Sequence, residues 1–175
     1  PVPLLAVLKH PLAYLGRTRG ALLGDVRALE RKYLRGPRPS GGLAGLRALL
    51  DSESESEAGP RAVLADLARA IEPLIKLPDP AALDVRLDGL EAVCRALMAR
   101  HDLPADTVLE ADPHGADIAA FFESLRAHAG LCVAIPLQDW PALFDLWVAR
   151  PVVRDRRPRE SRLFIWGLLE ARLMQ

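Results

Sequence analysis

The stretch DPAALDVRLDGLEAVCRALMAR, residues 79–100, decides the fold class of this chain. Asp79 followed by Pro80 is typical of a helix start, because a carboxylate caps free backbone N–H groups and proline fits the first turn. After it, apolar side chains recur every three or four positions, which is the spacing of one helix face. These side chains are Leu83, Leu87, Leu90, Val93, Leu97 and Met98. The stretch therefore predicts a long amphipathic helix.

The same spacing recurs on both sides of this stretch, between loops that carry proline or glycine. Further helices are predicted at residues 3–10, 21–35 and 43–50, from Pro60 to about Leu77, after Asp112-Pro113, and from Asp139 to Val148. Together they make about seven helices with short connections. This pattern predicts a mainly α chain, folded as an irregular helical bundle.

The last part of the chain has a different character. Six arginines lie between Arg150 and Arg162, and the continuous apolar run Leu163–Trp166 follows them. Such a run is typical of a buried strand, which is not stable alone and needs partner strands. We therefore expect a helical subdomain at residues 1–150, and a basic loop and a strand of a larger domain at 151–175. The start at Pro1 and the end within an element also indicate a piece of a longer protein.

Charge is unevenly distributed although the formal net charge is zero. Residues 1–47 carry nine Lys/Arg and two Asp/Glu, residues 48–149 carry seven and eighteen, and residues 150–175 carry seven and three. Part of the first basic block lies opposite the apolar face of helix 21–35, at Arg27, Arg31, Lys32 and Arg35. Two interpretations stay open: a cationic face for nucleic acid, or oppositely charged blocks that pack together. The acidic and serine-rich run at residues 51–57 predicts a solvated loop, with a phosphorylated segment as the alternative.

No set of residues indicates a catalytic, metal or cofactor site. The chain lacks a phosphate-binding Gly-x-x-x-x-Gly-Lys motif and a Gly-x-Ser-x-Gly motif, and no apolar run reaches membrane-spanning length. The histidines lack ligand spacing and favour surface or capping roles, and the two cysteines favour buried, inert thiols. The aromatic face on the last predicted helix favours core packing over base stacking. These residues are His10, His101, His114 and His128, Cys94 and Cys132, and Trp140, Phe144 and Trp147.

The arginine-rich loop is the best functional candidate on physical grounds. Arg150, Arg154, Arg156, Arg157 and Arg159 lie in a segment that contains proline. Guanidinium groups stay charged and bind phosphate oxygens in a bidentate manner, so the loop could follow a nucleic-acid backbone without reading bases. An ordinary solvated loop in an arginine-rich chain is the alternative.

Residues 162–172, RLFIWGLLEAR, resemble a signature of the AddB subunit of bacterial AddAB helicase–nucleases, of the alphaproteobacterial type. The opening residues 4–12, LLAVLKHPL, are similar to the start of the same region in that family. The resemblance implies a helical insert placed ahead of the strand of helicase motif V. An active motif V has Thr-x-His-x-Ala-Lys-Gly after that strand. Here Gly167, Leu169 and Arg172 stand at the Thr, His and Lys places, which implies a degenerate motor.

The resemblance also implies a function. The parent protein would be similar to an ATP-dependent helicase–nuclease (exonuclease) subunit in double-strand break repair and homologous recombination, in the bacterial cytoplasm. Its partners would be DNA, duplex or unwound, and an AddA-type helicase subunit, with no membrane. The nuclease and iron–sulfur features lie outside the chain, so no catalytic residue and no cofactor is expected in it. Phosphate contact is expected at Arg154, Arg156, Arg157, Arg159 and Arg172.

A second hypothesis belongs to a different class. The chain would be a helical protein–protein interaction module without a nucleic-acid role. Its docking surface would be the face of Trp140 and Trp147 or the acidic middle of the chain.

Overall fold

The computed structural model describes residues 2–36, 41–50 and 54–149, and these are mainly α-helical. The α-helices in these ranges are α1 (Val2–Lys9), α2 (Arg19–Leu29), α3 (Gly42–Ala48), α4 (Ala58–Ile75), α5 (Leu83–Met98), α6 (Ala105–Glu110), α7 (Gly115–Arg126) and α8 (Trp140–Val148). A π-helical turn, η1 (Glu30–Leu34), continues α2, and 3₁₀ turns form η2 (Glu55–Glu57) and η3 (Ala129–Leu131). The predicted helical bundle is confirmed.

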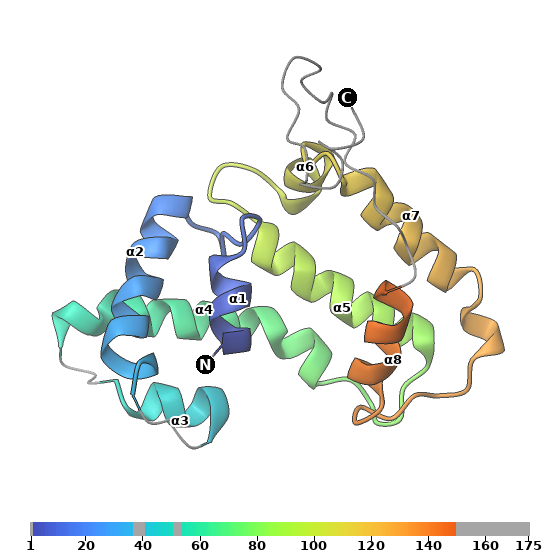
Figure 1. Cartoon of the computed structure of the whole chain (residues 1–175), viewed down its shortest axis with the longest axis horizontal. Helices are drawn as coiled ribbons and strands as arrows, with labels where there is room; N and C mark the ends of the chain where they lie inside the picture. The colour runs from blue at the N-terminus through green and yellow to red at the C-terminus, as the bar shows by residue number, and fades with distance from the viewer. Residues whose placement is uncertain (1, 37–40, 51–53, 150–175) are drawn as a thin grey trace, which may run out of the picture.

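Two long helices, α4 and α5, pack against each other and join the two ends of the molecule. Figure 1 shows α1, α2 and α3 around α4 at one end, with α7 and α8 beside α5 at the other. Because α4 and α5 are long, the surface formed by α1, α2 and α3 is separated from the surface formed by α7 and α8.

The core at the α4 end comes from the predicted apolar stripes. Leu22 and Val26 of α2 meet Val63 and Leu67 of α4, and all four side chains are buried. Leu29 joins an adjoining cluster with α3 and α4. Burial of one such side chain contributes roughly 1.5–3 kcal/mol. The stripe on α2 therefore fixes which side of this helix faces solvent.

The core at the α5 end holds the aromatic residues of α8. Trp140 is buried with Leu83 and Leu87 of α5. The rings of Phe144 and Trp147 lie 5.3 Å and 6.1 Å from that of Trp140, between ring centroids. The prediction of core packing for this aromatic face is confirmed, because its rings pack edge-on or tilted against one another and beside the buried leucines of α5.

The predicted start of the long helix is wrong by several residues. α5 begins at Leu83, and Asp79 does not cap it. Instead, the Asp79 carboxylate accepts hydrogen bonds from the buried guanidinium of Arg86 (3.0 Å) and from the backbone N–H of Leu137 (2.7 Å). A buried cation needs a counter-charge. Asp79 therefore neutralises Arg86 and does not cap α5.

Two further details differ from the sequence-based expectation. Helix α6 was not predicted, because its six residues are too short to show a periodic stripe. The run at residues 51–57 was expected to be solvated, but its last residue, Glu57, is only 2% exposed. Its carboxylate binds the ammonium of Lys32 and the hydroxyl of Tyr33. These two partners explain how a charged residue of that run is buried.

Some predictions lie outside the described residues. The strand Leu163–Trp166 and the segment 151–175 fall there, so the proposed boundary stays a prediction. In the ranges that the structure covers, β-type pairing is limited to one antiparallel bridge between Ala81 and Ile135. No helix in those ranges is long and apolar enough to cross a bilayer.

Candidate nucleic-acid interface

Four cationic side chains project from one side of α2 and η1. Arg27, Arg31, Lys32 and Arg35 are all exposed, and we call them the cationic face. They lie opposite Leu22, Val26 and Leu29, which the core buries. Arg27, Arg31 and Arg35 recur every four positions and so share one helix side, and Lys32 follows Arg31 directly in the sequence. The packing of α2 therefore turns these charges toward solvent.

The charges of the cationic face are only partly neutralised. Within the described residues, Arg27 and Arg31 form no ion pair, and Arg35 Nη2 lies 3.8 Å from Glu30 Oε1. Lys32 binds the buried carboxylate of Glu57, and this hydrogen bond holds the pKa of Lys32 above its usual value. Positive charge thus persists on the face at neutral pH and is available to an anion.

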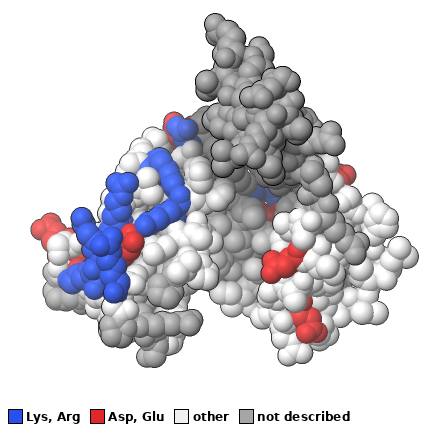
Figure 2. Space-filling view, in the orientation of Figure 1, with Lys and Arg blue, Asp and Glu red and all other residues white. Residues whose placement is uncertain are grey.

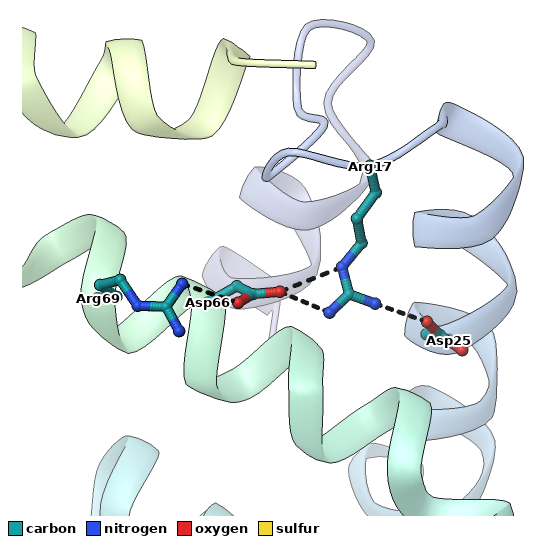
Figure 3. Close-up of polar contacts among 4 residues, drawn as sticks. All are labelled: Arg17, Asp25, Asp66 and Arg69. Atoms are coloured by element: carbon teal, nitrogen blue, oxygen red, sulfur yellow. Dashed lines mark hydrogen bonds and ion pairs between the residues drawn. The ribbon is translucent and has the colours of Figure 1, made fainter. Parts of the chain in front are cut away.

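An arginine clamp holds α2 in place (Figure 3). Arg17, in the loop between α1 and α2, donates from Nη1 to Asp25 Oδ2 of α2 (3.0 Å). It also donates from Nε (3.1 Å) and Nη2 (2.5 Å) to Asp66 Oδ2 of α4. Arg69 donates to the other Asp66 oxygen, 3.1 Å away. The clamp joins two helices and a loop, so it sets the direction in which the cationic face points.

The loop that carries Arg17 is itself anchored to α5. The backbone N–H groups of Tyr14 and Leu15 donate to the carbonyl of Leu97 (2.7 and 3.0 Å), and that of Gly16 donates to Ala99 (2.7 Å). Leu15 adopts φ 52°, a left-handed conformation that is uncommon outside glycine. The backbone bonds to the end of α5 explain why the loop keeps this conformation.

Charge is segregated along the molecule. Residues 2–36 carry seven Lys/Arg and two Asp/Glu, whereas residues 79–149 carry four and twelve. Figure 2 shows the Lys and Arg of the face in view gathered mainly at the end of the molecule that α2 forms, whereas Asp and Glu lie both there and in the half around α5 and α8. Both interpretations left open by the sequence are met in part, because the ion pairs Arg17–Asp66 and Lys32–Glu57 join the basic block to the acidic one, while Arg27 and Arg31 stay exposed.

A second surface feature lies between α1, α5, α6 and α7. It is a groove of about 610 Å³ with mainly apolar walls, among them Val7, Met98 and Phe122. Its rim is charged: Arg126 binds Glu91 (2.7 Å) on α5, and Arg95 binds Asp106 (3.2 Å) on α6. Five apolar side chains that come after α7 in the sequence are also exposed. They are Leu131, Val133, Leu137, Leu146 and Val148.

The arginines that the sequence singled out for phosphate contact lie outside the described residues. These are Arg154, Arg156, Arg157, Arg159 and Arg172. The structure instead brings together the cations of α2 and η1, which the sequence had placed on one helix face without assigning them a contact. The charge balance of residues 1–47 was the signal that pointed to them.

The remaining residues that the sequence offered as candidates for a site are the cysteines and histidines. Cys132 is exposed, so the expectation of a buried thiol is wrong there; it follows η3 in a segment without an apolar stripe. Burial raises the pKa of the half-buried Cys94 thiol, and the charge of Glu91 adds to this. His10 accepts a hydrogen bond from the backbone N–H of Leu12, and His128 Nδ1 lies 2.8 Å from the Ser124 carbonyl. No group of three potential metal ligands converges in the parts of the chain that the structure covers.

Comparisons with known proteins add no relative: no protein-family model matches the chain, and no curated protein and no solved structure was found to be similar.

Proposed function

We propose that this chain is a non-catalytic, DNA-binding helical subdomain of a double-strand break repair subunit of the AddB type. The observation that supports this proposal best is the cationic face of α2 and η1. The resemblance at residues 162–172 supports the choice of family, and the arginines at 150–162 would extend the phosphate contacts. Packing against an AddA-type partner subunit belongs to the same proposal.

The cationic face suits phosphate binding for an electrostatic reason. Each cation that neutralises a DNA phosphate releases a condensed counterion, so affinity falls steeply with salt concentration. Lys32 is engaged by Glu57, so three phosphate contacts, by Arg27, Arg31 and Arg35, predict a slope of about −2.7 for the logarithm of the binding constant against the logarithm of salt concentration. Between about 50 and 200 mM salt, this slope corresponds to a loss of roughly 40-fold in affinity.

The test is a titration of the whole 175-residue chain with a fluorescently labelled duplex of about 20 base pairs, at several salt concentrations. The variant Arg27→Gln/Arg31→Gln should reduce the magnitude of the slope by about 2, because each phosphate contact supplies about 0.9. The matched control is Lys76→Gln/Arg95→Gln, which removes two cations whose side chains are 72% and 54% exposed and which take no part in the clamp or in the cationic face. Circular dichroism verifies that both variants fold.

The expected result is that only the Arg27/Arg31 variant loses affinity. Equal losses in both variants would show a general charge effect and would count against the cationic face. A third variant has glutamine at Arg154, Arg156, Arg157 and Arg159. It measures how much of the DNA affinity these arginines of the basic loop contribute. A chain that binds equally well at low and high salt, or does not bind, would contradict the proposal.

The apolar groove favours a second candidate function, a protein–protein interaction module. A groove with apolar walls and a charged rim resembles the composition of protein interfaces, which have an apolar core and a polar rim. Ile118 lines this groove and is 38% exposed, so it is accessible to a partner. On this hypothesis the chain has no nucleic-acid role: it shows no salt-dependent binding of the labelled duplex, and Ile118→Asp abolishes binding to a purified AddA-type subunit in calorimetry, while Arg27→Gln/Arg31→Gln leaves that binding intact. The opposite pattern would count against the groove.

A further inference from the structure

We propose that the cationic face binds the sugar–phosphate backbone of duplex DNA without reading base order and without stacking on unpaired bases. This inference rests on the proposed DNA-binding function. It selects duplex over the unwound strand as the ligand of this face.

The first support concerns the two described tyrosines, both of which are half-buried and already have a cation over the ring. The ammonium of Lys32 lies 5.4 Å from the centroid of the Tyr33 ring, and the Tyr33 hydroxyl donates to Glu57 (2.5 Å). The Arg100 guanidinium lies 5.4 Å from the centroid of the Tyr14 ring. Proteins that bind single strands without sequence preference stack bases on exposed aromatic rings. In both tyrosines a cation thus already occupies one face of the ring, where a base would stack.

The other described aromatic rings belong to a different part of the molecule. Phe121 and Phe122 of α7 contact Phe144 of α8, with centroids 6.1 and 6.5 Å apart. Trp140 and Trp147 complete this cluster in the core beside α5. The elements that carry the cationic face, α2 and η1, contribute no ring to this aromatic cluster. A single strand on this face would therefore lack its main source of base affinity.

The second support concerns base edges. Asparagine and glutamine read adenine in the major groove, but the sequence contains no asparagine, and its two glutamines are Gln138 and Gln175. Arginine reads guanine only when it is held in a fixed orientation. Arg27 and Arg31 form no side-chain hydrogen bond within the described residues, so nothing there fixes their direction. Mobile guanidinium groups suit phosphate oxygens, which lie along the whole backbone.

The third support is charge density. From Arg27 to Arg35 the chain advances at most about 12 Å, the value for 1.5 Å per residue of α-helix, because the π-helical turn η1 rises less per residue. Over that length a duplex carries about seven phosphate charges and a single strand about half as many, from spacings of 1.7 and 3.4 Å. A face that binds by charge alone thus meets a stronger field on duplex DNA.

The test is a competition experiment with the full chain in which Arg150, Arg154, Arg156, Arg157, Arg159 and Arg162 are glutamine, so that the basic loop adds no charge to binding by the cationic face. A labelled duplex is displaced by three unlabelled competitors of equal length. Two are duplexes of the same base composition in different order, and the third is an oligo-dT strand. The two duplexes should compete within about two-fold of each other, and oligo-dT should be weaker by at least about three-fold.

The outcomes separate the inference from the function on which it rests. Tighter competition by oligo-dT, or a difference of more than about ten-fold between the duplexes, would overturn the inference while the DNA-binding function stands. Adding Arg27→Gln/Arg31→Gln must weaken both duplexes by the same factor, since phosphate contacts are independent of sequence. Unequal weakening would show base readout by these arginines. A chain that binds no DNA overturns both.

Discussion

Removal of the Arg17 side-chain charge should destabilise the fold measurably. Arg17 is 21% exposed and donates three hydrogen bonds to the carboxylates of Asp25 and Asp66, which are 30% and 23% exposed (Figure 3). In Arg17→Met the apolar stem is kept, but the two carboxylates lose their shared cation. Hydrogen bonds to charged groups contribute about 1.5–3 kcal/mol when buried. Partial exposure and the remaining Asp66–Arg69 contact reduce the total, so we expect a loss of about 2–3 kcal/mol.

The chain offers a matched control for this variant. Arg69 also donates to Asp66, but its side chain is 74% exposed. Exposed ion pairs contribute about 0–1 kcal/mol, so Arg69→Met should cost less than about 0.5 kcal/mol. Both substitutions remove a guanidinium group that binds Asp66. The two arginines differ in burial, and only Arg17 links α4 to α2.

Urea denaturation followed by circular dichroism measures both variants. We expect the unfolding midpoint to fall clearly in Arg17→Met, and the melting temperature to fall by about 5–10 °C at 2–4 °C per kcal/mol. A double-mutant cycle with Asp25→Asn should give a coupling energy of at least about 1 kcal/mol. Equal effects of Arg17→Met and Arg69→Met, or a coupling near zero, would refute the idea that the clamp holds α2 against α4.

Two further predictions concern backbone packing and thiol reactivity. Gly115→Ala should lower stability by about 1–3 kcal/mol, because a β-carbon would lie 2.0 Å from the carbonyl oxygen of Leu109 and force α6 and α7 apart. Gly130→Ala is the control, since its β-carbon would meet no atom within 4 Å, and thermal melts that show equal effects would contradict the packing. A thiol reagent at neutral pH should label Cys132 before Cys94, because Cys132 is exposed and burial raises the pKa of Cys94, which leaves less thiolate. Mass spectrometry of tryptic peptides measures both rates, and faster labelling of Cys94 would be the contrary result.

The apolar stripes allowed most helices to be predicted from the sequence. The spacing of Leu22, Val26 and Leu29 places the core side of α2 and, by exclusion, its solvent side. This periodicity is local, so it needs no knowledge of the tertiary fold. Helix α6 was not predicted because six residues give too little of a period.

Long-range pairing was beyond the reach of the sequence. Arg17 and Asp66 are 49 positions apart, and their contact exists only because α2 packs on α4. The roles of Asp79 and Glu57 likewise depend on partners from distant segments, Arg86 with Leu137 and Lys32 with Tyr33. A local pattern therefore predicts a cap or a solvated loop where tertiary contacts decide otherwise.

The most direct test of DNA binding by the cationic face is a nuclear magnetic resonance titration of the ¹⁵N-labelled chain with a duplex of about 20 base pairs. We expect amide shifts to change along α2 and η1, around Arg27, Arg31 and Arg35, and to return to their free positions when salt is added. The resonances of α5 and α8, in the acidic half, should stay unchanged. Shifts confined to α5, α7 and α8, or no shifts at low salt, would contradict the assignment of DNA binding to this face.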